Sequence, residues 1–295
     1  MLSLLALSAA ADPIQWTDLG LRSYLFEIGS FQLRYYSLAY LIGVIFAYWH
    51  LSKMIKSPGA PMAQRHADDL FFYCTLGVIL GGRLGYALFY QPSLFTSFAG
   101  DGFVSWELLR LWDGGMSFHG GVLGVLLAIF FVGRGGNLSF LRVCDYIAVT
   151  YPLGHLLGRL ANFANGELWG RPSDVAWAMV FPGGGEVGRH PSQLYQAGLE
   201  GLLPLIILMW MFWKTGARYR PGLLVGVFTL LMSAARFINE FFREPDQHLA
   251  SRVVETGLSQ GQWLTIPLFF VGLFVTLYAL TRKDGAAAGK GTEAA

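Results

Sequence analysis

Seven long stretches of this chain contain almost no charged residues, and they restrict its fold more than any other feature of the sequence. Each stretch holds at most two residues of the types Asp, Glu, Lys and Arg. A helix that crosses the hydrocarbon core of a membrane needs about 20 mostly apolar residues. The sequence therefore predicts seven transmembrane helices, over residues 35–52, 70–90, 114–133, 143–163, 192–213, 221–242 and 262–281.

The composition supports a membrane protein rather than a large soluble core. Only 14% of the 295 residues are charged, whereas a typical soluble domain contains about 25%. Nucleic acid is not an expected partner, because no run of Lys and Arg is dense enough to form a binding surface for it.

The charges between the apolar stretches predict how the helices are oriented. If alternate connections lie on opposite sides, one set carries eleven Lys and Arg residues against five Asp and Glu, a net charge of +6. The remaining charged residues of the chain have a net charge of −4. Cytoplasmic connections carry the excess of Lys and Arg, so the N-terminus is expected outside and the C-terminus in the cytoplasm. The basic set comprises 53–69, 134–145, 214–220 and the tail from residue 282.

The expected fold is an all-α polytopic membrane protein with about seven transmembrane helices and a small head on the outer side. The outer connections are long and rich in Gly and Pro, whereas the inner ones are short. We expect an outer or interfacial N-terminal segment over 1–33, a transmembrane domain over 34–281 that includes outer loops 91–117, 164–191 and 243–261, and a disordered cytoplasmic tail over 282–295.

Six polar residues in or beside the apolar stretches are predicted to reach one level, close to the outer surface of the membrane. At 1.5 Å per residue, Arg83, Arg159 and Arg236 lie about 21, 26 and 24 Å from the inner face. Charges inside a membrane are costly, so they mark either internal ion pairs or a functional site. The other three members of the set are Tyr36, His119 and Glu240.

Three arginines at one level of a membrane repel one another unless anions lie between them. A guanidinium group matches phosphate oxygens with two parallel hydrogen bonds, and a phosphate just below the outer surface belongs to a phospholipid headgroup. The residues alone therefore suggest a site for a lipid phosphate. The competing interpretation is that these arginines pair with Glu200 and Glu240 only to hold the helices together.

Polar residues and glycines concentrate in a few short motifs. One of them places Arg159, Asn162, Asn165, Glu167 and Arg171 within fourteen residues where a predicted helix ends. The motifs are WDGGMSFHGG over 112–121, GRLANFANGELWGRP over 158–172, RHPSQLYQAGLEG over 189–201 and ARFINEFFREPD over 235–246.

These motifs resemble those of the prolipoprotein diacylglyceryl transferase family. The segment from Gly158 to Gly170 resembles the family signature G-R-x-G/A-N-F-x-N-x-E-x-x-G, and the other motifs follow in the family's order. Two residues depart from the pattern. Ala164 replaces a bulkier apolar residue, and Met232 stands where some members carry Tyr, so no phenol is expected to act there.

The resemblance implies a membrane enzyme of the bacterial inner membrane with a small periplasmic head. The donor would be phosphatidylglycerol, and the acceptor would be the thiol of the lipobox cysteine in a prolipoprotein signal peptide. The product would be a thioether, formed in the first step of lipoprotein maturation. Membrane lipids surround such a protein.

The resemblance also implies the site. Arg159 falls on the position that binds the phosphatidylglycerol headgroup, and Asn162, Glu167 and Gly170 are expected to bind the donor with it. Arg83 joins this group because of its predicted depth. The residues expected to be catalytic are Tyr36, His119, Arg236 and Glu240.

The chemistry is compatible with these residue types. Only a thiolate attacks well, and a free thiol has a pKa of about 8.5, so a nearby base is needed. His119 is the natural candidate, with Glu240 or Glu167 next. The arginines would stabilise the negative charge that grows on the leaving phosphate. No metal or organic cofactor is expected.

Two other functions are compatible with parts of the sequence. A lipid transporter or flippase would also bind phosphate through arginines, but it should carry polar residues across the full depth of the membrane, and the predicted first, third and seventh helices do not. A non-catalytic scaffold protein would leave His119 without a role.

Overall fold

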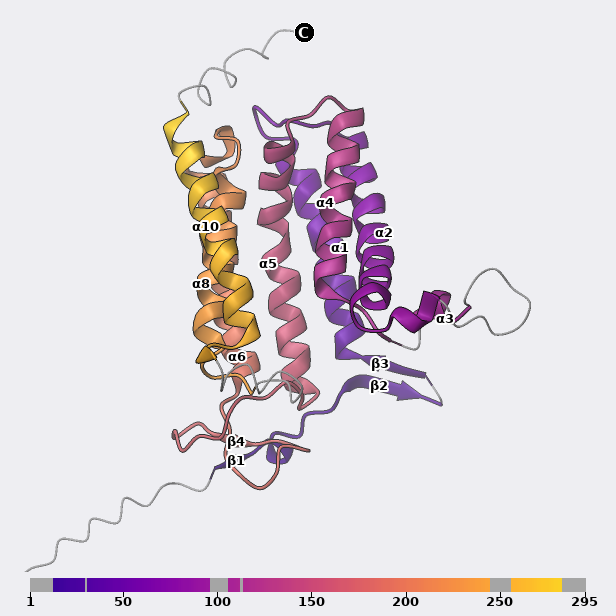
Figure 1. Ribbon diagram of the computed structural model, residues 1–295, viewed down its shortest axis with the longest axis vertical. Helices are drawn as coiled ribbons and strands as arrows, with labels where there is room; N and C mark the ends of the chain where they lie inside the picture. Colours follow the sequence, from indigo (N-terminus) through magenta and orange to yellow (C-terminus); the bar gives the residue numbers. More distant parts are fainter. Residues whose placement is uncertain (1–12, 30, 96–105, 112–113, 245–255, 283–295) are drawn as a thin grey trace, which may run out of the picture. The chain divides into compact units, whose positions relative to one another are not determined.

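A computed structural model describes residues 13–29, 31–95, 106–111, 114–244 and 256–282 (Figure 1). The chain forms two compact units. The first unit comprises Met1–Ala47 and Ile147–Lys283, and the second comprises Tyr48–Tyr146 and Asp284–Ala295. Residues 283–295 of the expected tail and residues 1–12 lie outside the described residues.

The first unit is mainly helical. Two of its helices continue into the second unit: α1 (Tyr35–Met54) and α5 (Phe140–Ala164). The helices α8 and α10 run side by side (Figure 1). The other helical elements are α6 (Ser192–Gln196), the π-helix η4 (Ala197–Leu202), α7 (Leu203–Lys214), η5 (Ala217–Tyr219), α8 (Leu223–Asn239) and α10 (Gln260–Thr281).

Strands in the first unit tie the N-terminal part of the chain to the loop after α5. Strand β1 (Ile14–Gln15) pairs in parallel with β4 (Met179–Val180). The next element, η1 (Trp16–Leu19), buries Trp16, whose indole nitrogen donates to the carbonyl of Phe163 at 2.9 Å. Strands β2 (Tyr24–Ile28) and β3 (Phe31–Arg34) form an antiparallel hairpin that leads directly into α1 (Figure 1).

The second unit is built on two long helices that run side by side, α2 (Gln64–Phe89) and α4 (Phe118–Gly135) (Figure 1). Glycines line their contact, because a Cβ atom added to Gly124 would collide with the backbone of Gly77, and one added to Gly120 would collide with that of Gly81. The short elements η2 (Pro92–Phe95) and α3 (Trp106–Leu109) lie between them in sequence.

Every predicted apolar stretch contains a helix, but the helices differ in length and composition. Four helical segments of the described chain are long and apolar enough to cross a membrane, and Leu223–Asn239 is a shorter apolar helix. The structure thus agrees with a mostly helical membrane protein, whereas the number of seven crossings stays a prediction. The four segments are Gln64–Phe89, Phe118–Gly135, Ser192–Lys214 and Gln260–Thr281.

Candidate functional site

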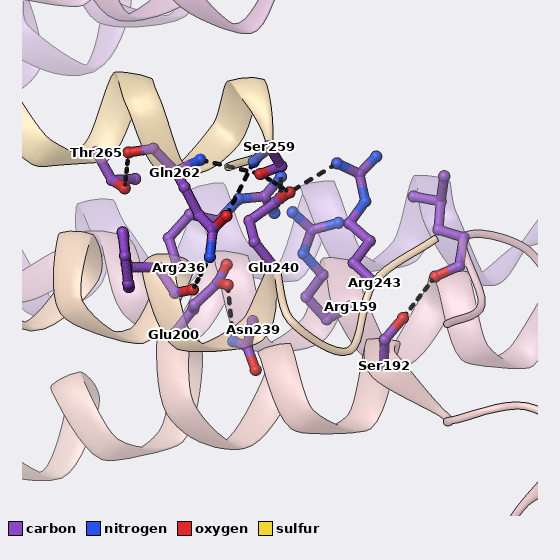
Figure 2. A network of polar contacts seen from close by, with 12 residues as sticks. Arg159, Ser192, Glu200, Arg236, Asn239, Glu240, Arg243, Ser259, Gln262 and Thr265 are labelled. Atoms are coloured by element: carbon purple, nitrogen blue, oxygen red, sulfur yellow. Dashed lines mark hydrogen bonds and ion pairs between the residues drawn. The ribbon is translucent and has the colours of Figure 1, made fainter. Parts of the chain in front are cut away.

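Charged residues of the first unit gather at the C-terminal end of α8. Arg236 and Glu240 are one turn apart, and their Nη2 and Oε1 atoms are separated by 2.6 Å. Arg243 approaches the same carboxylate oxygen at 3.5 Å. Figure 2 shows both arginines pointing toward Glu240. A single buried carboxylate therefore serves two guanidinium groups.

The second oxygen of Glu240 is held by the start of α10. The hydroxyl of Ser259 donates to Oε2 at 2.7 Å. Ser259 also caps α10, since its Oγ accepts from the backbone nitrogen of Gln262 at 3.1 Å. A Cβ atom on Gly261 would lie 2.6 Å from the Glu240 carboxyl carbon, so this glycine allows the carboxylate to approach the helix closely. Both oxygens of Glu240 are thus in use.

Arg159, near the C-terminal end of α5, lies beside these residues without sharing their ion pairs. It interacts electrostatically with Arg236 and Arg243, and Figure 2 shows its side chain next to theirs. Its Nη1 donates to Asn162 Oδ1 at 3.4 Å, and its Nε lies 3.5 Å from His155 Nε2. Among the described residues no carboxylate forms an ion pair with Arg159. Its guanidinium group is therefore loosely held.

The turn after α5 brings further predicted residues together. The carboxylate of Glu167 accepts hydrogen bonds from Asn162 at 2.8 Å and Asn165 at 3.2 Å. Gly166 has a positive φ of 67°, which allows the chain to reverse here. Tyr36, near the start of α1, interacts electrostatically with Arg159 and Glu167. The motif over 158–172 thus forms a connected polar surface, to which α1 contributes a phenol.

A buried carboxylate group lies on the other side of Arg159. Glu200 is 1% exposed; its Oε1 accepts from the Asn239 amide at 2.8 Å, and its Oε2 lies 3.0 Å from His155 Nε2. Glu200 stands out in the sequence as a charge within an apolar stretch, whereas His155 and Asn239 were not predicted. Both were missed because they lie 45 and 39 positions away from Glu200, and only an excess of polar residues within apolar stretches could have indicated them.

Close packing explains why position 170 carries glycine. Its backbone nitrogen donates to the carbonyl of His190 at 2.8 Å, and a Cβ atom would collide with the carbonyl of Phe242. Burial lowers the pKa of the neighbouring His190, against the opposite effect of Asp174. Burial thus favours the neutral imidazole, and Nδ1 of His190 lies 3.1 Å from the hydroxyl of Tyr195. Donor binding by Gly170 stays a prediction.

Two predicted site residues, Arg83 and His119, belong to the second unit. Arg83 donates to the backbone carbonyls of Glu107 at 2.5 Å, Leu108 at 2.9 Å and Gly114 at 2.6 Å. This guanidinium group organises the loop before α4, and its binding of a phosphate stays a prediction. His119 is exposed in the first turn of α4. Their shared level with the arginines of the first unit also stays a prediction.

The structure brings together six of the predicted site residues within the first unit. In the described part of the chain no group of three or more His, Cys, Asp or Glu residues has the arrangement of a metal site. The arrangement offers guanidinium groups, paired carboxylates and amides, which suit an anion with several oxygen atoms. The six residues are Tyr36, Arg159, Asn162, Glu167, Arg236 and Glu240.

Known proteins share these motifs over nearly the whole chain. A family model described as prolipoprotein diacylglyceryl transferase matches residues 23–278. A phosphatidylglycerol–prolipoprotein diacylglyceryl transferase of Erythrobacter litoralis is 63% identical over 276 residues, which cover 93% of this chain and 95% of the relative. Proteins of the same name from Zymomonas mobilis and Bordetella avium are each 45% identical, covering 92% and 87% of this chain and 95% and 93% of their own lengths.

Proposed function

Because the chain belongs to the prolipoprotein diacylglyceryl transferase family, we propose that it transfers the diacylglyceryl group of phosphatidylglycerol to the lipobox cysteine of a prolipoprotein signal peptide. The curated relatives carry both substrates in their names. This reaction is favoured over lipid transport or flipping, the main alternative that the sequence allowed.

The proposed reaction is a substitution at carbon. The cysteine thiolate attacks the glyceryl carbon that carries the phosphate oxygen, so a carbon–sulfur bond forms as that carbon–oxygen bond breaks. The thiol proton passes to a base, and glycerol phosphate leaves with both electrons of the broken bond. The phosphodiester of the donor carries one negative charge, and the phosphate monoester that leaves carries more. Groups that stabilise this growing charge accelerate the step.

The observation that carries the proposal is the uneven pairing of the three arginines. Arg236 and Arg243 share the carboxylate of Glu240, whereas Arg159 has no ion-pair partner among the described residues. A guanidinium group with free donors beside two further cations is suited to a phosphate. We assign Arg159 to the donor headgroup, with Asn162 and Glu167 orienting it and its neighbours.

The remaining assignments are part of the same proposal. Arg236 and Glu240 form a rigid pair that supports the leaving phosphate, and Tyr36 lines the same surface. His119 would accept the thiol proton, and Arg83 would shape the loop that precedes it. The chain would cross the inner membrane seven times, with a periplasmic head, a periplasmic N-terminus and a cytoplasmic C-terminus. The site would then face donor lipids of the outer leaflet.

Replacement of Arg159 by Lys tests the headgroup assignment. Lys keeps the charge but loses the planar fork, so the KM for phosphatidylglycerol should rise by about tenfold or more. The rate of transfer to a lipobox peptide would be measured at graded mole fractions of phosphatidylglycerol in mixed micelles. Thermal unfolding of the purified variant would show whether it still folds.

Arg171→Lys is the matched control for this experiment. Arg171 lies on the loop beyond α5, and its Nε donates to the backbone carbonyl of Arg243 at 2.9 Å, which a lysine ammonium group can also reach. The KM of Arg171→Lys for phosphatidylglycerol should stay within about threefold of the parent value. Equal tolerance of Lys at both positions would remove Arg159 from the headgroup site.

A further inference from the structure

We propose that His155 is a positioning residue that keeps Arg159 available for the donor phosphate. It does so by occupying the Glu200 carboxylate, which would otherwise form an ion pair with Arg159. The inference rests on the proposed role of Arg159. It gives a function to a histidine that neither the motifs nor the reaction require.

The contacts of His155 define its orientation. Nε2 lies 3.0 Å from Glu200 Oε2, and Nδ1 lies 3.2 Å from the hydroxyl of Tyr151. A carboxylate can only accept, so Nε2 carries the hydrogen, while Nδ1 accepts from the phenol. An Nε2 that already donates to Glu200 cannot accept from Arg159. The 3.5 Å approach of Arg159 Nε is therefore a packing contact between two donors.

This geometry makes the imidazole a spacer between opposite charges. Glu200 Oε2 and Arg159 Nε lie 3.0 and 3.5 Å from the same nitrogen atom, His155 Nε2. Glu200 is buried and Arg159 is partly buried, and an ion pair gains strength in a medium of low dielectric constant. Without the ring, the unpaired oxygen of Glu200 would draw the guanidinium group toward itself and away from the surface that carries Asn162 and Glu167.

The local backbone supports a specialised position for Glu200. It lies in the π-helix η4, an irregularity that inserts one extra residue into a helical turn and often accompanies a functional site. Its other oxygen is fixed by Asn239 at 2.8 Å. The carboxylate is thus anchored from α8, and His155 covers the oxygen that remains. The other charged or titratable groups that interact with His155 are Tyr151, Arg159 and Arg236.

The test compares KM and kcat for a set of purified variants in mixed micelles of phosphatidylglycerol, with a lipobox peptide as acceptor. His155→Ala should raise the KM for phosphatidylglycerol about tenfold and change kcat much less, because the competing ion pair weakens binding of the headgroup. The double variant His155→Ala/Glu200→Gln should recover a KM within about threefold of the parent, because a neutral amide cannot compete for Arg159.

Two further variants separate positioning from packing. His155→Gln places an amide donor near the position of Nε2, so it should keep most of the affinity. Leu156→Ala removes volume from the contact between α5 and η4, where Leu156 packs on Gly201. It leaves the hydrogen bond between His155 and Glu200 in place. It should lower the thermal stability but not raise the KM.

The outcomes distinguish this inference from the proposed function. A parent-like KM for His155→Ala, or a double variant as weak as His155→Ala alone, would overturn the spacer role. Arg159→Gln, measured in the same series, should show a raised KM whether or not His155 is a spacer. A parent-like KM for Arg159→Gln would instead overturn the headgroup assignment.

Discussion

At the scale of single residues, the partners of each arginine define its role better than its position in the sequence does. Arg236 and Arg243 form ion pairs with Glu240, and Arg83 donates to backbone carbonyls. Arg159 retains donors that no carboxylate of the described chain occupies. The sequence grouped three of these arginines by depth. It could not separate their roles, because the backbone partners of Arg83 lie 24 or more positions away and the surroundings of Arg159 depend on how the helices pack. By contrast, the pair of Arg236 and Glu240, four positions apart, is local in the sequence.

His119→Gln tests the base assignment. Gln preserves size and some hydrogen bonding but cannot accept the thiol proton, so transfer should slow by about 10²–10⁴-fold while phosphatidylglycerol still binds. A thiol ionises unaided near its pKa of about 8.5, so the deficit should shrink as the pH rises from 6 to 9. The measurement is the ratio of variant to parent rate across this range.

A constant ratio at every pH would contradict a base at His119. It would mean that the imidazole only holds the loop that precedes α4. Glu240 already accepts hydrogen bonds at both oxygens in this structure, so Glu167, which is exposed, would be the next candidate to test.

Arg83→Lys tests the loop before α4. The guanidinium group donates to several backbone carbonyls at once, and an ammonium group cannot reach them all. Each hydrogen bond lost contributes about 0.5–1.5 kcal/mol, so the thermal unfolding temperature should fall. Arg65→Lys is the control, because Arg65 is exposed near the other end of α2. Equal unfolding temperatures for the two variants would show that the carbonyls find other donors.

At the scale of elements, the apolar stretches predicted where helices form but not how they are capped, interrupted or joined. The stretch over 192–213 contains the π-helix η4. It was not predicted, because the local sequence carries no pattern that distinguishes a π-turn from an α-turn. The hairpin of β2 and β3 was also missed. Gly29, with a positive φ of 60°, marks its turn, and this glycine between two short apolar segments was the available signal.

The glycine contact between α2 and α4 gives a prediction at this scale. Gly124→Ala would drive a Cβ atom into the backbone of Gly77, and the two helices must separate to relieve the collision. The expected loss of stability is about 1–3 kcal/mol. Thermal unfolding in detergent, followed by circular dichroism, measures it.

Gly135→Ala provides the control for this experiment. It lies on the same helix, and no heavy atom stands within 4 Å of an added Cβ. Its stability should stay within about 1 kcal/mol of the parent or rise slightly, because Ala is the better helix former. A similar loss for both variants would contradict close packing at Gly124.

At the scale of the whole molecule, the two units are connected through helices. The chain passes from the first unit to the second within α1 and returns within α5. The motif over 158–172, at the C-terminal end of α5, supplies three of the six polar residues gathered in the first unit, whereas His119 and Arg83 come from the second. Both groups were predicted from the sequence, because intramembrane charges are rare enough to stand out. The partners of these charges could not be predicted, because they depend on how the helices pack.

The charge difference between the two sets of connections predicts the topology. In a variant with Cys74 and Cys144 replaced by Ala, a cysteine at Glu186 should react with a membrane-impermeant thiol reagent added to intact spheroplasts. A cysteine at Pro58 should react only after the membrane is permeabilised. Both positions are exposed on loops in this structure. The reverse pattern of labelling would place the arginine cluster toward the cytoplasm and contradict a periplasmic site.

The contact between Trp16 and Phe163 also has a consequence for biosynthesis. The two residues are 147 positions apart. Strand β1 and its partner β4 are separated by an even longer stretch of chain. At about 5–20 residues per second, a ribosome needs roughly 7–30 s to make the intervening chain. The segment that is synthesised first is therefore among the last to reach its final position. Until then, its tryptophan must remain outside the core that later encloses it.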